Sequence, residues 1–215
     1  MIEQAFEHVE TWVFDLDNTL YPPSANLFEL IQERMTAWVM STLQISQAEA
    51  EHVRHRYWRE HGTTLAGLMR HHQIDPVPYL RDVHDIPMDR LDPDPLLAEH
   101  IRALPGRRIV YTNACVPYAE RVLTARGLDG VFDAIYGVED ANYHPKPDHA
   151  AFQQIFNLDG LQPRAAAMFE DEPRNLSVPH ALGMRTVLVS DLRPDDAHIH
   201  HHTDDLTSFL RRLTG

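Results

Sequence analysis

Short apolar runs recur along this chain, and polar residues directly follow most of them. The five runs are Thr11–Phe14, Arg108–Tyr111, Ala134–Tyr136, Ala166–Phe169 and Thr186–Val189. Short runs that are hydrophobic throughout, rather than alternating, are typical of strands buried on both faces of a parallel sheet. Asp15, Thr112 and Glu170 each come directly after one run. The pattern predicts polar side chains at the carboxyl ends of buried strands.

Helix-like stretches separate several of these runs. They are Tyr118–Ala125, Asp148–Phe156 and Leu176–Leu182, the last of which contains Pro179. Strands that alternate with helices indicate an α/β fold with a parallel sheet. Ligands of such sheets bind beyond the carboxyl ends of the strands. The polar residues at those ends are therefore the first candidates for a functional site.

The segment from Tyr21 to about Asp94 breaks this alternation, because it contains no strand pattern. Four apolar residues recur at helical spacing near its start: Phe28, Ile31, Met35 and Trp38. Ser46 and Glu49 form a capping-box pattern before a second helix, which ends near Gly62. Shorter helices are expected at Leu65–His72, Val77–His84 and Leu96–Leu104. We predict a core made of residues 1–20 and 95–215, with residues 21–94 inserted as helices that cover the strand ends.

Asp15 and Asp17 follow the first strand and are the first candidates for catalysis. Two carboxylates at this spacing can face one ligand if the chain turns there. One can attack phosphorus to give an aspartyl-phosphate, and the other can protonate the leaving oxygen and then activate water. A calcium loop that began at Asp15 would need Gly and Glu where this chain has Leu20 and Asn26. That interpretation therefore fails.

Thr112 and Asn113 follow the second strand, where a hydroxyl and main-chain N–H groups can hold a phosphate oxygen without adding charge. Lys146 lies in the run His144–Pro147 before a helix. Pro147 suits a first helical turn, which would place Lys146 beside the positive end of the helix. We expect Lys146 to balance the charges of the nucleophile and the phosphate.

Three consecutive acids, Glu170, Asp171 and Glu172, end another apolar run. Such a cluster is unfavourable unless a cation neutralises part of it. Asp171 is the preferred metal ligand, Glu170 is the second, and Glu172 is expected to lie outside the site. Mg²⁺ prefers oxygen ligands of this kind.

The composition supports a metal and excludes some partners. The formal charge of −13 argues against binding of a nucleic acid polymer, which needs clustered Lys and Arg. The same acidity would repel a phosphate ester unless a divalent cation were bound. The 215 residues, 43% hydrophobic and 24% charged, suit one domain or a core with a smaller appendage.

No apolar stretch approaches the roughly 18 residues of a membrane helix, and residues 1–10 lack the apolar run of a secretory signal. The single cysteine, Cys115, cannot form an internal disulfide, which is compatible with a reducing cytoplasm. We therefore expect a cytoplasmic monomer or homodimer that does not contact membranes.

In their order and spacing these motifs resemble those of the haloacid dehalogenase superfamily of hydrolases, over about residues 11–190. Asp15 and Asp17 match its first motif, Thr112 the second, Lys146 the third, and Glu170-Asp171 the acidic fourth, with Glu170 replacing the commoner aspartate. The resemblance implies a doubly wound, Rossmann-like core with a helical cap inserted after the first strand. It also implies that Asp15 is the nucleophile and a metal ligand. Asp17 would be the general acid and base, and its main-chain carbonyl would also bind Mg²⁺.

A finer resemblance is to the pyrimidine 5′-nucleotidase-like branch. It is carried by residues 14–28, 111–114, 143–152 and 169–176. It implies a nucleoside 5′-monophosphate as the substrate. The sequence indicates no residue that reads the base.

We therefore expect a Mg²⁺-dependent phosphatase that hydrolyses a small phosphate monoester. A carbon–halogen hydrolase would need neither a proton donor nor a metal, so Asp17 and the pair Glu170-Asp171 count against it. A phosphomutase of the β-phosphoglucomutase type shares the aspartyl-phosphate chemistry and remains an alternative. A non-catalytic binding protein on the same fold is a further alternative.

Three other features have more ordinary interpretations. The cluster His198–His202 is expected in a solvated acidic loop. Tyr21 follows the nucleophile motif and is expected either to pack or to contact substrate. Cys115 is expected to be a small buried thiol, because no partner histidine follows from the sequence.

Overall fold

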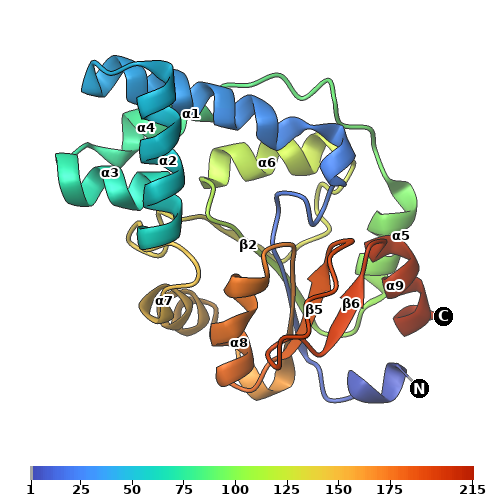
Figure 1. Cartoon of the computed structure of the whole chain (residues 1–215). Coiled ribbons are helices and arrows are strands. Elements are labelled where there is room, and N and C mark those ends of the chain that lie inside the picture. The colour runs from blue at the N-terminus through green and yellow to red at the C-terminus, as the bar shows by residue number, and fades with distance from the viewer. Residues whose placement is uncertain (1) are drawn as a thin grey trace.

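Six parallel strands form one sheet in the computed structural model of the protein, which describes residues 2–215 (Figure 1). The strands are β1 (Thr11–Phe14), β2 (Arg107–Tyr111), β3 (Ala134–Tyr136), β4 (Ala166–Glu170), β5 (Arg185–Val189) and β6 (His201–Thr203). Their order in the sheet is β3-β2-β1-β4-β5-β6, and every neighbouring pair is parallel. The chain winds outward from β1 on one side and then from β4 on the other, so the switch point lies between β1 and β4. The predicted doubly wound α/β fold is confirmed.

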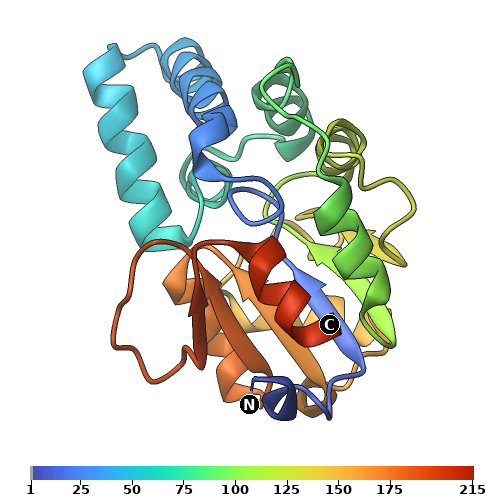
Figure 2. The ribbon, with the colours of Figure 1, turned by 90° about the vertical axis from the view of Figure 1, so that its right-hand side faces the viewer.

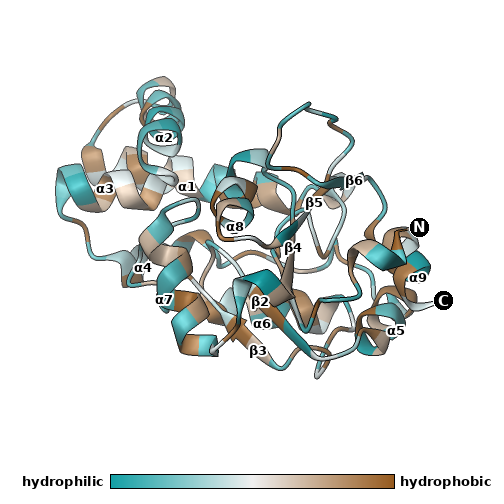
Figure 3. Cartoon of the chain, turned by 90° about the horizontal axis from the view of Figure 1, so that it is seen from below, coloured by the Kyte–Doolittle hydropathy of each residue, from teal (hydrophilic) through white to brown (hydrophobic). Residues whose placement is uncertain are grey.

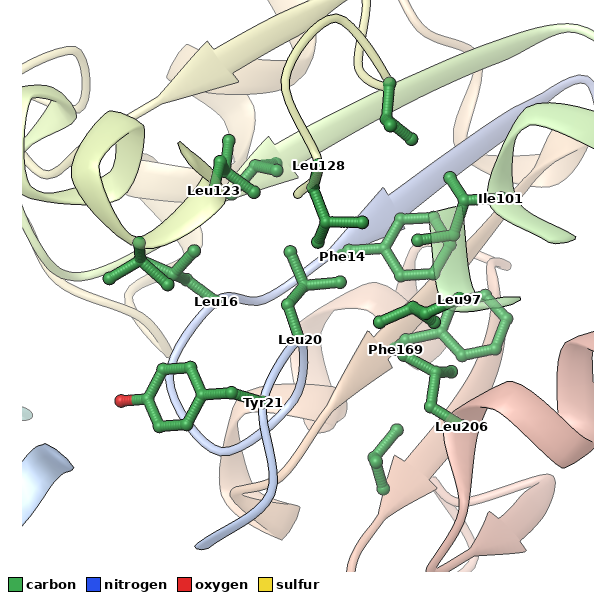
Figure 4. Packing of buried hydrophobic residues seen from close by; sticks show 14 of the residues in the cluster. Phe14, Leu16, Leu20, Tyr21, Leu97, Ile101, Leu123, Leu128, Phe169 and Leu206 are labelled. Carbon is green, nitrogen blue, oxygen red and sulfur yellow. The ribbon is translucent and has the colours of Figure 1, made fainter. Parts of the chain in front are cut away.

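The central strand β1 is buried on both faces, which explains why its sequence is hydrophobic throughout. Successive side chains of a strand point to opposite faces. Trp12 and Phe14 belong to the hydrophobic cluster on one face, and Val13 belongs to the cluster on the other. Phe14 stacks on Phe169 of β4, with ring centroids 4.7 Å apart (Figure 4).

Helices pack on both faces of the sheet. On the face of Phe14 lie α5 (Pro95–Ala103), α6 (Val116–Ala125) and α9 (Leu206–Thr214). On the face of Val13 lie α7 (His149–Asp159) and the short α8 (Ser177–Ala181). Leu97 and Ile101, one turn apart on α5, both point into the first cluster (Figure 4). Figure 3 shows that these helices carry both hydrophobic and hydrophilic residues, as expected for helices that cover a sheet.

Four helices lie between β1 and α5, and residues 21–94 contain no strand. They are α1 (Leu27–Leu43), α2 (Gln47–His61), α3 (Thr64–His72) and α4 (Pro76–Val83). They lie together at one end of the sheet (Figures 1 and 2) and have a hydrophobic cluster of their own, which includes Val39, Leu68 and Tyr79. We call α1–α4 the helical segment. The division of the chain at residues 20/21 and 94/95 into two units stays a prediction.

The helix α2 begins and ends as its sequence predicts. The Ser46 side chain accepts a hydrogen bond from the Glu49 main-chain N–H, and the Glu49 carboxylate accepts one from the Ser46 main-chain N–H. Gly62 follows the last turn with a φ of 87°, a conformation that favours glycine. The predicted capping box is confirmed.

One buried arginine joins the two connections of the helical segment to the sheet. Arg126 follows α6, and its Nε donates to the carbonyl of Leu20 at 3.1 Å. Its terminal nitrogens donate to the carbonyl of Asp92 and, at 3.0 Å, to the carboxylate of Asp94. Residue 20 precedes the segment and residues 92–94 follow it, so this guanidinium holds both ends together.

The structure corrects two expectations. His201 and His202 lie in β6 and are half-buried, so this part of the histidine cluster is not a solvated loop. The helix α7 begins at His149 with Asp148 as its N-cap, so Pro147 precedes the helix instead of forming its first turn. The helix expected at 176–182 is observed as α8, and a 3₁₀ turn, Pro173–Leu176, precedes it. None of the helices within residues 2–215 has the length and apolar character needed to span a membrane.

Candidate active site

The loop after β1 carries both predicted catalytic aspartates. The N–H of Asp15 still donates to the carbonyl of Phe169 in β4, at 2.9 Å, so the position of Asp15 is fixed by the sheet. The chain then turns at Asn18, whose φ is 57°, and the N–H of Leu20 donates to the carbonyl of Leu16 at 2.9 Å. This turn brings Asp15 and Asp17 to the wall of one cavity.

Lys146, the one lysine of the sequence, links three strand ends. Its ammonium donates to Asp15 Oδ1 at 2.6 Å, to Glu170 Oε2 at 2.7 Å and to the carbonyl of Tyr111 at 3.0 Å. Only 1% of the residue is exposed. Burial lowers the pKa of Lys146, but the charges of Asp15 and Glu170 outweigh burial and leave the pKa above its ordinary value. The ammonium therefore stays charged and balances these carboxylates.

Asn113 holds the main chain of Lys146. Its side-chain Oδ1 accepts from the Lys146 N–H at 2.7 Å, and its Nδ2 donates to the Lys146 carbonyl at 3.3 Å. The neighbouring Thr112 accepts a hydrogen bond from the Ala114 N–H at 3.0 Å through its hydroxyl. Both residues line the cavity, but the amide of Asn113 is occupied in positioning Lys146. Their contacts to phosphate stay a prediction.

Asp15, Glu170 and Asp171 form a cluster in which one oxygen from each lies within 4.8 Å of the others. Glu170 is the most constrained, because Lys146 contacts Oε2 and the Glu172 N–H donates to Oε1 at 3.1 Å. Asp171 accepts a hydrogen bond from the Asn18 amide at 3.2 Å. Glu172 is not part of this cluster, although it lines the same cavity.

The electrostatics of this cluster fit a divalent cation. Burial, followed by the charge of Glu170, raises the pKa of Asp15 to about 8 although Lys146 opposes the shift. Burial and the charges of Glu170 and Asp15 raise the pKa of Asp171 well above its ordinary value. One lysine therefore does not compensate all three carboxylates. An all-oxygen set with excess negative charge suits Mg²⁺.

Asp17 is held by two tyrosines. The hydroxyls of Tyr21 and Tyr118 both donate to Asp17 Oδ1, at 2.6 and 2.8 Å. Burial is the main cause that raises the pKa of Asp17. Tyr21 therefore contacts a candidate catalytic group with its hydroxyl, and Figure 4 shows its ring beside the loop that contains Leu16 and Leu20. Sequence reasoning missed Tyr118, which is 101 positions away from Asp17.

The cavity has a volume of about 490 Å³ and lies between the strand ends and the helical segment. All seven predicted site residues line it: Asp15, Asp17, Thr112, Asn113, Lys146, Glu170 and Asp171. The apolar side chains that the helical segment adds include Phe28, Ile31, Met35, Leu65, Leu80 and Val83. The same part of the chain also adds polar side chains: Gln32, Arg54, His55, Thr63, Thr64, Tyr79 and His84. The structure thus brings the predicted residues together, while their roles stay predictions.

Arg174 connects the acidic loop to the helical segment. It donates to the carbonyl of Trp58 at 2.9 Å and to that of Gly62 at 3.0 Å, and its guanidinium lies 3.9 Å from the centroid of the Trp58 ring. These carbonyls are at the C-terminal end of α2, where cations are favoured.

Cys115 has a histidine partner that the sequence did not indicate. His84 Nδ1 lies 3.2 Å from its Sγ. Burial lowers the pKa of His84 to about 4 and raises the pKa of Cys115. Both groups are therefore neutral near pH 7, and the pair lacks the thiolate that a nucleophile requires.

A doubly wound sheet with this set of residues at its switch point defines a class of hydrolases. The sequence profile of the haloacid dehalogenase-like hydrolases matches residues 12–189, and the chain belongs to this family. Among curated proteins it is similar to phosphate metabolism protein 8 of Saccharomyces cerevisiae, with 28% identity over 208 residues. The match covers 88% of this chain but 65% of the yeast protein, so the chain spans about two thirds of its relative.

Solved structures share the fold at lower identity. A phosphatase of the same superfamily from Thermococcus onnurineus has a TM-score of 0.64 and 17% identity, over 96% of this chain and 98% of that one. The hydrolase YfnB from Bacillus subtilis, bound to magnesium, has a TM-score of 0.62 and 15% identity, over 96% and 99%. Other neighbours are named dehalogenases. At these identities the comparisons establish the fold.

Proposed function

We propose that the protein is a Mg²⁺-dependent phosphatase that hydrolyses a nucleoside 5′-monophosphate through an aspartyl-phosphate. The observation that carries this proposal is the convergence of Asp15, Asp17 and Lys146 on one cavity beside the acidic cluster. A nucleophile, a second carboxyl group and a fixed cation are the groups that this reaction needs.

In the proposed reaction Asp15 attacks phosphorus and the ester P–O bond breaks. Asp17 gives its proton to the departing oxygen in the same step. It then takes a proton from the water that attacks the aspartyl-phosphate, which releases phosphate and restores Asp15. Lys146 orients Asp15 through the 2.6 Å contact and offsets negative charge throughout.

Asp15, Asp171 and the main-chain carbonyl of Asp17 are the ligands we propose for Mg²⁺, with Glu170 as a further candidate. When bound, the ion would offset the charge of the phosphoryl oxygens. Glu170 is the weaker candidate because both its oxygens already accept hydrogen bonds, from Lys146 and from the Glu172 N–H.

The cavity supports a leaving group of nucleoside size. Its volume of about 490 Å³ lies within the usual range for small-molecule sites, roughly 300–1,000 Å³. The apolar side chains in this mixed lining, such as Phe28 and Leu65, suit the faces of a base. Arg54 provides a positive charge there, and no carboxylate lies within 4.0 Å of it in residues 2–215. It can donate hydrogen bonds to carbonyl groups of a pyrimidine.

The rival functions differ in what they require of these residues. A dehalogenase does not need a proton donor, whereas Asp17 is half-buried and held in one orientation by two hydrogen bonds. A phosphomutase would return the phosphoryl group to a sugar phosphate, so the ratio of isomerised product to free phosphate distinguishes it from a phosphatase.

The test is release of phosphate from nucleoside monophosphates, sugar phosphates and small phosphoesters, with Mg²⁺ and with excess chelator. We expect Mg²⁺-dependent release that is fastest with uridine or cytidine monophosphate and is abolished in a folded Asp15→Asn variant. Activity retained in that variant would refute Asp15 as the nucleophile. Fastest release from another ester would keep the mechanism and exclude the nucleotide.

A further inference from the structure

Two phenol hydroxyls converge on a single oxygen of Asp17. Tyr21 donates to Oδ1 at 2.6 Å and Tyr118 donates to the same atom at 2.8 Å. Both tyrosines are 1% exposed. Within residues 2–215, Oδ2 of Asp17 has no hydrogen bond. The two oxygens of one carboxyl group are therefore in different environments.

This asymmetry decides which oxygen can transfer a proton. A carboxyl oxygen that accepts two hydrogen bonds is favoured as the carbonyl oxygen of the acid, so the proton resides on the other oxygen. The tyrosines also fix the rotation of the carboxyl group.

We propose that Tyr21 and Tyr118 are positioning residues that direct Oδ2 of Asp17 at the leaving oxygen of the substrate. The proposal rests on the proposed phosphatase function. As the ester P–O bond breaks, its electron pair stays on the ester oxygen, which receives the proton from Oδ2. Oδ2 later accepts a proton from the attacking water, so the group returns to its starting state.

The two tyrosines come from different parts of the chain. Tyr21 lies in the connection from β1 to α1, whereas Tyr118 lies in the first turn of α6. The Tyr118 ring also stacks on His84 at the end of α4, with centroids 4.5 Å apart and an angle of 17° between the planes. The orientation of Asp17 therefore depends on packing between the helical segment and the helices on the sheet.

Leaving-group dependence tests this proposal. An alkyl phosphate needs a proton on its leaving oxygen, whereas p-nitrophenolate leaves without one. We compare kcat/KM for p-nitrophenyl phosphate with kcat/KM for the alkyl phosphate that the wild type hydrolyses fastest. This parameter covers the steps up to phosphorylation of Asp15 and so excludes the later use of Asp17 as a base.

The variants are Tyr21→Phe, Tyr118→Phe and the double variant, with Tyr57→Phe as the matched control. Tyr57 is also buried in the protein, but its hydroxyl contacts His72 and it does not line the cavity. We expect losses of about tenfold for each single variant and about 100-fold for the double variant with the alkyl phosphate, because a general acid contributes roughly 10²–10⁴-fold. With p-nitrophenyl phosphate we expect less than a twofold loss, and Tyr57→Phe should match the wild type with both esters.

Equal losses with both esters, or no loss with either, would overturn the proposal. The variant Asp17→Asn separates this failure from failure of the proposed function. If Asp17→Asn discriminates between the esters and the tyrosine variants do not, only the positioning role is wrong. If Asp17→Asn shows no discrimination, the acid role of Asp17 itself is wrong, and the positioning role is wrong with it.

Discussion

Replacing Lys146 by Met tests the charge balance of the site. Met keeps an unbranched apolar side chain and removes the ammonium, which contacts two buried carboxylates at 2.6 and 2.7 Å. Removing one partner from a buried ion pair typically destabilises a protein by about 3–5 kcal/mol, because the remaining charge is uncompensated. With a typical urea dependence of about 2 kcal/mol per molar, the unfolding midpoint should fall by roughly 1.5–2.5 M.

Urea denaturation followed by circular dichroism at pH 7, first with chelator and then with Mg²⁺, measures this effect. Mg²⁺ should restore part of the lost stability, because the ion neutralises the same carboxylates that Lys146 contacts. The control is Arg34→Met, which removes a cation from an exposed ion pair with Asp85. Exposed pairs contribute about 0–1 kcal/mol, so the control midpoint should change little.

A Lys146→Met midpoint equal to that of the wild type in chelator would refute this reasoning. It would mean that the cluster does not hold uncompensated charge when the ammonium is lost. A large loss that Mg²⁺ does not reduce would keep the role of Lys146 and contradict metal binding by Asp15 and its neighbours.

Three further predictions concern the helical segment. Burial lowers the pKa of His84 from 6.5 to about 4, so the unfolded state binds a proton between these values while the folded state does not. Protonation of His84 in the unfolded state should therefore lower the free energy of unfolding by about 2 kcal/mol as pH drops from 7 to 5. Denaturation of His84→Asn at pH 7 and pH 5 should show a pH dependence that is smaller by this amount. Arg54→Met should lower kcat/KM for uridine monophosphate about tenfold or more. The value of kcat/KM for ribose 5-phosphate should stay nearly unchanged, since this substrate has no base. Equal losses with both substrates would contradict recognition of the base by Arg54. Arg174→Ala should destabilise the protein by about 1–2 kcal/mol. It should also increase acrylamide quenching of tryptophan fluorescence, because Trp58 loses its contact with the guanidinium. Unchanged quenching would show that Arg174 does not hold α2.

The strands that carry the site, β1, β2 and β4, could be predicted from the sequence. They are buried on both faces of the sheet, so each contains a run of apolar residues. β6 could not, because it is three residues long and two of them are histidines. His201 becomes a packing residue only through Phe6 and Phe209, whose rings lie 5.1 and 6.2 Å away. The helix α9 does have a signal in the sequence, because Leu206, Phe209 and Leu210 are spaced as a helix requires.

The candidate catalytic residues were predictable for a related reason. Asp15, Thr112 and Glu170 directly follow or end strands, so their proximity follows from the parallel sheet. Tyr118, Arg54 and Arg174 have no such local signal. Each becomes part of the site through contacts with segments far away in the sequence, which only the packing of the helical segment against the sheet determines.

The presence of a single lysine makes the site chemically addressable. A reagent that acylates lysine finds one side-chain target in the 215 residues, and that amine is 1% exposed. Its modification requires the three hydrogen bonds of the ammonium to break. The labelling rate, followed by mass spectrometry, therefore measures how often the active site opens. A ligand that closes the site should lower the rate at which Lys146 is labelled.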